Sequence, residues 1–168
     1  MKAKSLFFIL LALCVVFFLV GCDGGSGGGG NDSSITYIIS DINPKDDISS
    51  PIESVSGGIK FTATESFIDV ETIINDTITL KKDNTFSSTL KITEDGLVAF
   101  NTTFTGTWSG NDTSMTLTVK EAKENITGTT EAYSDTWTYV ISDSGNTADK
   151  NEAYHATNGW KPTYTKQQ

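Results

Sequence analysis

The chain has 168 residues, with 21 acidic against 12 basic side chains and a formal net charge of −9. Every basic residue is a lysine, so the chain lacks the guanidinium group that is best suited to gripping phosphate. Nucleic-acid binding is therefore a poor hypothesis. The length suits one domain with a modest core and leaves little room for a second.

The first 21 residues have the pattern of a cleaved export signal. Two lysines, Lys2 and Lys4, precede an apolar run over 6–20. A run of this length is typical of signal peptides and is shorter than the roughly 20 residues of a membrane-spanning helix. Loss of both lysines with the signal would change the net charge from −9 to −11. The two cysteines are Cys14, inside the signal, and Cys22, so we expect no intramolecular disulfide in the mature chain.

The residues at the end of this run, Leu19-Val20-Gly21-Cys22, resemble the lipobox of bacterial lipoproteins. In that family the cysteine sulfur receives diacylglycerol and the chain is cleaved just before it. The resemblance implies that Cys22 is the lipid attachment site and the first mature residue. We expect a protein held on a bacterial membrane of the cell envelope, with its domain outside the cytoplasm. Residues 22–34 are rich in glycine and serine and are expected to form a flexible tether that spans roughly 20 Å.

Beyond the tether the sequence predicts an all-β domain. Apolar and polar residues alternate with period two in four segments, which is the signature of half-buried strands. One face of each predicted strand is apolar, and the other is rich in threonine. The four segments are Thr85–Thr93, Val98–Trp108, Met115–Lys120 and Thr136–Ile141.

Short turn signals separate these segments and indicate antiparallel neighbours. They are Asn75-Asp76, Lys82-Asp83-Asn84, Glu94-Asp95-Gly96, Gly110-Asn111-Asp112 and Asp143-Ser144-Gly145-Asn146. The prediction is an antiparallel up-and-down meander that closes as a barrel or half-barrel to hide its apolar face.

The domain is expected to occupy residues 59–168, with strands over Ile59–Thr64 and Phe67–Ile74. Residues 35–58 are polar and interrupted by Pro44 and Pro51, so we expect a partly ordered lead-in there, in which 35–39 could form a strand. Residues 122–131 are expected to form a loop.

Three segments of the chain resemble the bacterial lipocalin-like lipoproteins: Ile78–Phe86, Phe104–Ser109 and Met115–Val119. They match a strand with a D-G-T-F-type turn, a G-x-W strand and a T-L-T-L-T-type strand. Asn84 stands where that family usually has glycine, and no Gly-x-Trp opens the domain. The resemblance implies a barrel of eight to ten strands with a possible cavity for an apolar ligand.

Enzyme chemistry, cofactors and metal sites find little support in the sequence. His155 is the only histidine, and the one mature thiol is expected to be lipid-modified, so a nucleophile–histidine pair is missing. Glu152 with His155 lacks the further ligands that zinc requires. Asp69 and Glu71 share a strand face and are expected to be solvated. Weak calcium binding at the acidic surface stays open.

The aromatic residues are the strongest candidates for a binding role. They project from apolar strand faces and could line a ligand cavity, or they could simply fill a small barrel. The candidate lining residues are Phe100, Phe104, Trp108, Trp137 and Tyr139. Gly106 would leave a gap between two of them. Trp160 could close one end of the barrel.

Two functional hypotheses follow. The first is a lipid-anchored extracytoplasmic barrel that binds or carries a small apolar molecule. The alternative is a structural or interaction lipoprotein of the cell envelope, with a filled core and no small-molecule ligand. An open interior would favour the first, and an interior filled by side chains would favour the second.

Overall fold

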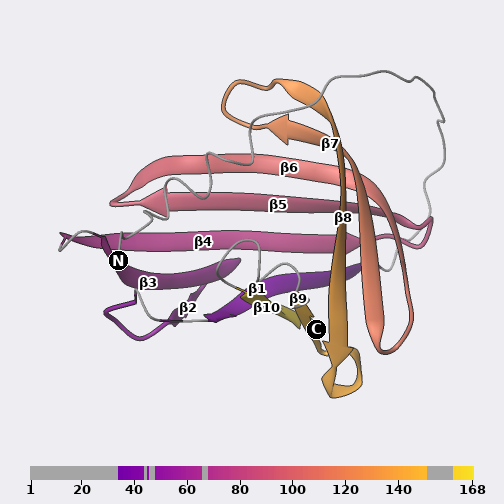
Figure 1. The fold of residues 1–168 in the computed structure, drawn as a ribbon, viewed down its shortest axis with the longest axis horizontal. Coiled ribbons are helices and arrows are strands. Elements are labelled where there is room, and N and C mark those ends of the chain that lie inside the picture. The colour runs from indigo at the N-terminus through magenta and orange to yellow at the C-terminus, as the bar shows by residue number, and fades with distance from the viewer. Residues whose placement is uncertain (1–33, 44, 46–47, 66–67, 151–160) are drawn as a thin grey trace, which may run out of the picture.

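The computed structural model describes residues 34–43, 45, 48–65, 68–150 and 161–168. They form an antiparallel sheet of ten strands, together with one short 3-10 turn, η2 (Asp143–Gly145) (Figure 1). The strands are β1 (Ile35–Asn43), β2 (Glu53–Val55), β3 (Gly58–Glu65), β4 (Ile68–Leu80), β5 (Thr85–Glu94), β6 (Leu97–Gly110), β7 (Ser114–Glu124), β8 (Thr130–Ser142), β9 (Thr147–Lys150) and β10 (Lys161–Lys166).

Eight of these strands close into an up-and-down barrel. From β4 to β10, each strand pairs with the strand that follows it in the chain. Strand β1 completes the ring, because it pairs with β10 on one side and with β4 on the other. Closure satisfies the backbone groups that an open sheet would leave unpaired at its edges. The expected all-β meander is therefore confirmed, in its closed form.

The closure divides β4 between two partners. Its second half pairs with β1, from Ile35 opposite Leu80 to Ile38 opposite Thr77. Its first half pairs with β3, which carries β2 on its outer edge. Strands β3 and β2 therefore extend the sheet where β1 has left β4, and a bulge between Ile39 and Asp41 accompanies that departure.

Three sequence expectations need correction. Residues 35–58 were expected to be a partly ordered lead-in, but β1 is an integral barrel strand, so the barrel begins at Ile35 and not at Ile59. Asn75-Asp76 was expected to be a turn, but β4 runs through it without interruption. Residues 122–131 were expected to be a loop, but β7 and β8 extend into this range and leave only a tight turn.

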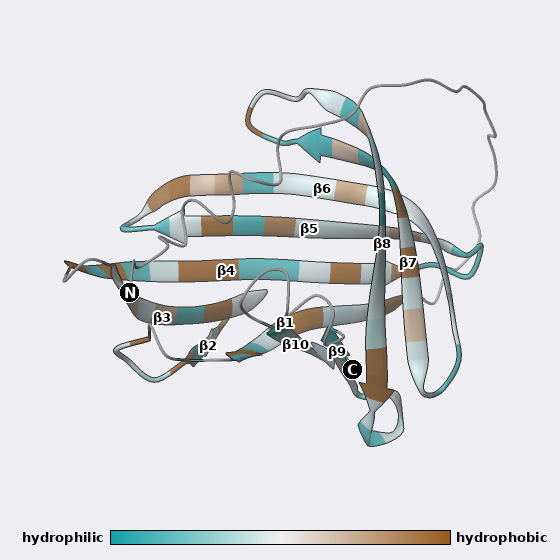
Figure 2. Cartoon of the chain, in the orientation of Figure 1, coloured by the Kyte–Doolittle hydropathy of each residue, from teal (hydrophilic) through white to brown (hydrophobic). Residues whose placement is uncertain are grey.

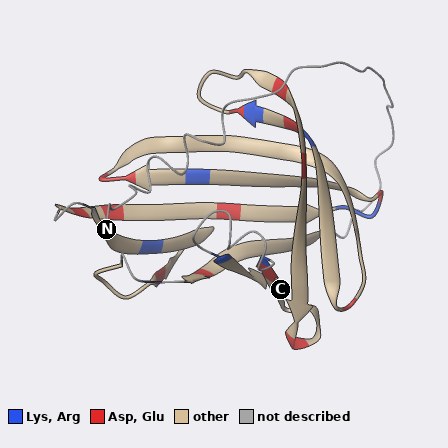
Figure 3. Cartoon of the chain, viewed as in Figure 1, with Lys and Arg blue, Asp and Glu red and all other residues tan. Residues whose placement is uncertain are grey.

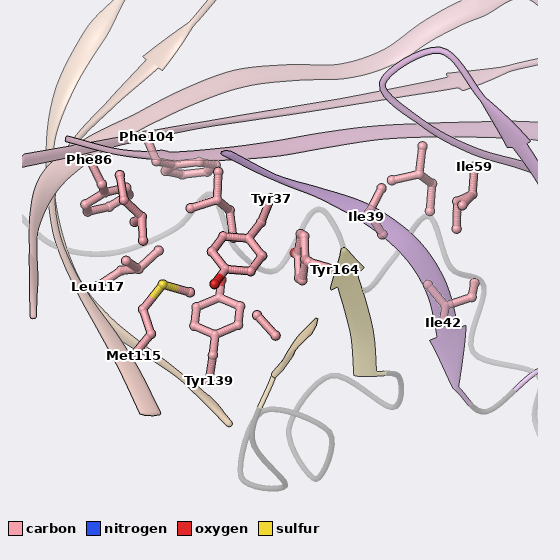
Figure 4. Close-up of a cluster of buried hydrophobic side chains, with 14 of the residues drawn as sticks. Tyr37, Ile39, Ile42, Ile59, Phe86, Phe104, Met115, Leu117, Tyr139 and Tyr164 are labelled. Carbon is pink, nitrogen blue, oxygen red and sulfur yellow. The ribbon is translucent and has the colours of Figure 1, made fainter. Parts of the chain in front are cut away.

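The predicted inward faces form the core. Phe86, Ile92, Phe104, Leu117 and Tyr139 are buried, whereas Leu90 and Phe100 are partly buried and pack against them. The alternation of apolar and polar residues along the strands is visible in Figure 2. In Figure 4, Tyr37, Tyr139 and Tyr164 lie together, with Phe86, Leu117 and Met115 on one side and Ile39, Ile42 and Ile59 on the other.

Turn chemistry fixes the hairpins. Asn84 has a φ of 63° and Asp95 a φ of 47°, in the left-handed region that asparagine and aspartate tolerate better than other non-glycine residues. The Asp83 carboxylate accepts hydrogen bonds from the Thr85 amide and hydroxyl at 2.9 and 2.6 Å. Asn84 can therefore replace the glycine of the resembling family without losing the turn.

Candidate functional site

Two of the candidate lining residues meet inside the barrel. The rings of Phe104 on β6 and Trp137 on β8 pack edge to face, with centroids 5.0 Å apart. The Tyr133 ring also contacts Phe104, with ring centroids 5.7 Å apart. This geometry is favourable for aromatic pairs and contributes about 0.5–1.5 kcal/mol beyond the burial of area. The β6 and β8 aromatics therefore share one interior, and they fill part of it.

The gap expected at Gly106 is occupied by protein. A Cβ atom at this position would lie 2.0 Å from the Thr118 carbonyl oxygen and 2.9 Å from Cε1 of Phe86. Phe86 is the cross-strand partner of Gly106 on β5, and its ring covers the glycine. The glycine thus permits close approach of β7 and of an aromatic ring, and it opens no space for a ligand.

Trp108 lies at the end of the barrel. Its indole Nε1 donates a hydrogen bond to the Lys81 carbonyl oxygen at 2.8 Å, and its backbone amide donates to the Asn84 carbonyl oxygen at 2.8 Å. It is partly buried against the core. Trp108 therefore fastens β6 to the β4–β5 turn. Phe100 lies toward the opposite end of β6, beside Ile92 of β5.

A buried polar cluster, which the sequence analysis missed, crosses the apolar interior. Asp76 on β4 is 8% exposed. Its carboxylate accepts hydrogen bonds from the Tyr164 hydroxyl at 2.7 Å and from the Ser88 hydroxyl at 3.2 Å. The Tyr164 ring packs edge to face against Tyr139, with centroids 5.7 Å apart. The chain of contacts continues to Lys150 on β9, whose Nζ donates to the Tyr139 hydroxyl at 3.0 Å.

The Lys150 side chain is enclosed by aromatic rings. It is 5% exposed, and its Nζ lies 4.1 Å from the Trp137 ring centroid and 4.8 Å from that of Tyr139. Ammonium groups are attracted to the faces of such rings. Burial lowers the pKa of Lys150 to about 7, against the attraction of the Asp76 and Asp135 carboxylates.

Burial also disfavours the charged form of Asp76, at the other end of this cluster. Burial raises the pKa of Asp76 above its ordinary value, while the hydrogen bond from Tyr164, the charge of Lys150 and the hydrogen bond from Ser88 act in the opposite direction. The polar cluster therefore holds two ionisable groups of opposite sign whose burial favours their neutral forms. Perturbed ionisable groups of this kind are concentrated at functional sites.

A signal for Asp76 exists in the sequence. It occupies an inward position of β4, between Ile74 and Ile78 in the period-two pattern, so it is an acid on an apolar strand face. Because Asn75-Asp76 was predicted to be a turn, Asp76 was not recognised as an inward residue. The signal for Lys150 is weaker, because β9 has only four residues.

A separate hollow of about 570 Å³ lies on the outside, where β1 diverges from β4. The Asp41 carboxylate and the Lys45 ammonium form an ion pair at 2.9 Å there, and both side chains are about half exposed. Exposed pairs of this kind contribute little to stability. The hollow is lined by Ser40, Asp41, Lys45, Ile48, Ser50, Pro51 and Ile52.

The acidic candidates do not gather into a site. Asp69 is exposed and accepts hydrogen bonds from the Thr64 and Ser49 hydroxyls, and Glu71 pairs with Lys60 at 2.6 Å. Within the described ranges, no group of three or more His, Cys, Asp and Glu side chains is arranged to hold a metal ion. None of the helical structure described for this chain is long and apolar enough to span a membrane.

Several sequence expectations concern residues outside the described part of the chain. These are the signal at 1–21, the lipid attachment at Cys22 with most of the tether, the Glu152–His155 pair and Trp160. They stay predictions.

No protein-family model, curated protein or solved structure matches this chain. The closed antiparallel barrel of eight strands is compatible with the lipocalin-like fold, and the comparisons add no family to that observation.

Proposed function

We propose that this chain is a lipid-anchored extracytoplasmic barrel that binds a small, largely apolar molecule carrying a polar or anionic group. The observation that supports the proposal is the polar cluster of Asp76, Ser88, Tyr139, Lys150 and Tyr164. Binding sites for small molecules are mostly apolar, with a few convergent polar groups that orient the ligand. Lys150 is the group in this cluster that suits an anionic headgroup.

Energetics support a role for the polar cluster beyond stability. Burying an ammonium and a carboxylate costs several kcal/mol for each ion, and a well-packed apolar substitute is often as stable or more stable. Asp76 and Lys150 are nevertheless buried, at 8% and 5% exposure, and Lys150 contacts Tyr139 and Trp137. A ligand that interacts with these groups would account for their presence. The proposed role is binding, without catalysis, on a bacterial envelope membrane to which Cys22 attaches the domain.

A second candidate is a structural or interaction lipoprotein with a filled core. It is favoured by the Phe86 ring over Gly106 and by the edge-to-face contact of Phe104 with Trp137. In this case the polar cluster would serve only to fix the register and pairing of β4, β5, β8, β9 and β10.

Tryptophan fluorescence distinguishes the two candidates. Because Trp137 lies 4.1 Å from the Lys150 ammonium, its emission should respond to a ligand at the polar cluster, and Trp137→Phe identifies its share of the signal. The purified protein is titrated with fatty acids, the matched fatty alcohols, isoprenoids and small aromatics. We expect Lys150→Met to weaken fatty-acid binding more than fatty-alcohol binding, and Lys120→Met, at an exposed position of β7, to change neither. A chain that responds to no member of the panel would support the second candidate.

A further inference from the structure

Lys150 differs from the other lysines of the chain in its position. Among the described residues it is the only lysine that is buried, whereas Figure 3 shows most charged residues at strand ends and turns. It is the last residue of β9 and pairs across the strands with Tyr139, whose hydroxyl lies 3.0 Å from its Nζ. The amine is therefore held at a defined place inside the barrel.

The surroundings of this amine are apolar and aromatic. Its Nζ lies over the rings of Trp137 and Tyr139, and Met115 is the cross-strand neighbour of Tyr139 on β7. A lysine that is desolvated in this way gives up its proton readily and becomes a nucleophile. Because burial lowers the pKa of Lys150 to about 7, about half of the chains hold the neutral amine at neutral pH, whereas an ordinary lysine is neutral in fewer than about 0.1% of molecules.

One side of the amine leads toward the solvent. Trp137 is only partly buried against the core, and its indole Nε1 donates a hydrogen bond to the Asp135 carboxylate at 2.8 Å. Asp135 is exposed and lies on the same strand, two residues before Trp137. Strand β9 pairs with Tyr139–Ser142 of β8, and Lys150 lies where this pairing ends. A ligand whose reacting end is at Nζ can therefore extend along the Trp137 ring toward the exposed Asp135.

We propose that the Lys150 amine binds apolar aldehydes covalently, as a reversible imine. The inference rests on the function proposed above, because the aldehyde has to reach the polar cluster. Lysine amines form imines with carbonyl compounds, and an aldehyde reacts in this way without an activated leaving group. The rings of Trp137 and Tyr139 suit an apolar or aromatic body on the aldehyde.

The reaction balances without a further reactant. The nitrogen lone pair of Lys150 attacks the carbonyl carbon, the electrons of the C=O π bond move to the oxygen, and one nitrogen proton is transferred to that oxygen. The resulting carbinolamine loses its hydroxyl group as water together with the second nitrogen proton, and the C=N double bond forms. The Tyr139 hydroxyl, 3.0 Å from Nζ, is placed to relay these protons. Addition of water reverses the steps and releases the ligand.

Borohydride trapping tests the proposal. The purified full-length chain is incubated at neutral pH with one equivalent of cinnamaldehyde or decanal, and sodium borohydride then reduces any imine to a stable secondary amine. Intact mass counts the adducts, and peptide mapping locates them. Lys150→Met removes the amine, and Lys120→Met makes the same change at an exposed position of β7.

We expect the wild type and Lys120→Met to carry one adduct, which maps to Lys150 and is at least about tenfold more abundant there than at any exposed lysine, because of the difference in neutral amine. Lys150→Met should lose this adduct. Unfolding the wild type in urea should abolish the preference for Lys150, and this comparison needs no folded variant. Adducts that show no preference for Lys150 in the folded wild type, or an unchanged adduct in Lys150→Met, would overturn the proposal.

The matched alcohols separate this proposal from the function on which it rests. Cinnamyl alcohol and decanol have the same apolar bodies as the two aldehydes and form no imine. If the alcohols change the Trp137 emission while the aldehydes leave no adduct at Lys150, the imine proposal fails and non-covalent binding stands. If no member of the panel changes that emission and no adduct forms, both proposals fail.

Discussion

Replacing Lys150 by methionine should remove a specific pH dependence of stability. The folded chain holds this ammonium at 5% exposure, and burial lowers its pKa from 10.5 to about 7. The unfolded chain exposes the same group to water, so its pKa there is close to the ordinary value of 10.5. Between these two values the unfolded state binds more protons than the folded state, and stability must therefore rise as the pH rises.

The magnitude follows from the two pKa values. Each pH unit across which one state is protonated and the other is not contributes about 1.4 kcal/mol. Raising the pH from about 7.5 to about 9.5 should therefore increase the free energy of unfolding by about 2–3 kcal/mol. This is a large part of a typical total stability of about 5–15 kcal/mol. This pH range ends below the pH at which the Tyr37 hydroxyl ionises, because burial raises the pKa of that hydroxyl above 10.0.

Urea unfolding at the two pH values measures the effect. Lys120→Met is the matched control, because it removes one lysine from an exposed position of β7. We expect the wild type and Lys120→Met to gain stability with pH and Lys150→Met to lose that gain. The reasoning would be refuted if Lys150→Met kept the same pH dependence as the wild type, because Lys150 would then be charged and solvated in the folded state.

Three further predictions concern the core, the strand contacts and the anchor. Phe104→Ala should lower the free energy of unfolding by about 3–5 kcal/mol in urea titrations, because it removes the ring that packs against Trp137 and Tyr133. A loss below about 1 kcal/mol would mean that the neighbours collapse into the cavity. Gly106→Ala should destabilise the barrel, since its Cβ would lie 2.0 Å from the Thr118 carbonyl oxygen, and a melting temperature equal to that of the wild type would contradict the packing described. Cys22→Ala should give an uncleaved or released chain with an unchanged circular dichroism spectrum. Intact mass and detergent partitioning test this, and a wild-type chain that carries no lipid would contradict the prediction.

Strands were predicted correctly where their signals, alternation and turn residues, lie within a short stretch of sequence. In β5, the alternation of Phe86, Ser88, Leu90 and Ile92 with threonines and other polar residues gives the inward face directly. The turn at Asn84 is likewise encoded within a few residues. Period-two alternation and turn chemistry act over short stretches of chain, so no partner strand has to be known to read them.

Two of the three corrected expectations involve partners distant in the chain. Asp76 can stay inside β4 because Tyr164, 88 residues away, donates a hydrogen bond to it. Strand β1 is ordered because β10 and β4 hold its two sides. Neither partner is visible in the residues around Asn75-Asp76 or around Ile35. Polar residues in such a strand therefore resemble a turn or a lead-in when only their neighbours in the chain are considered. Their partners become evident only in the closed barrel.

The position of β1 also relates the proposed anchor to the barrel ends. The described chain enters the barrel at Ile35, which pairs with Leu80, beside the turn to which Trp108 is fastened. The lipid anchor proposed at Cys22 would therefore hold this Trp108 end nearer the membrane. The opposite ends of the long strands carry the exposed apolar residues Leu97 and Ile126 at the β5–β6 and β7–β8 turns.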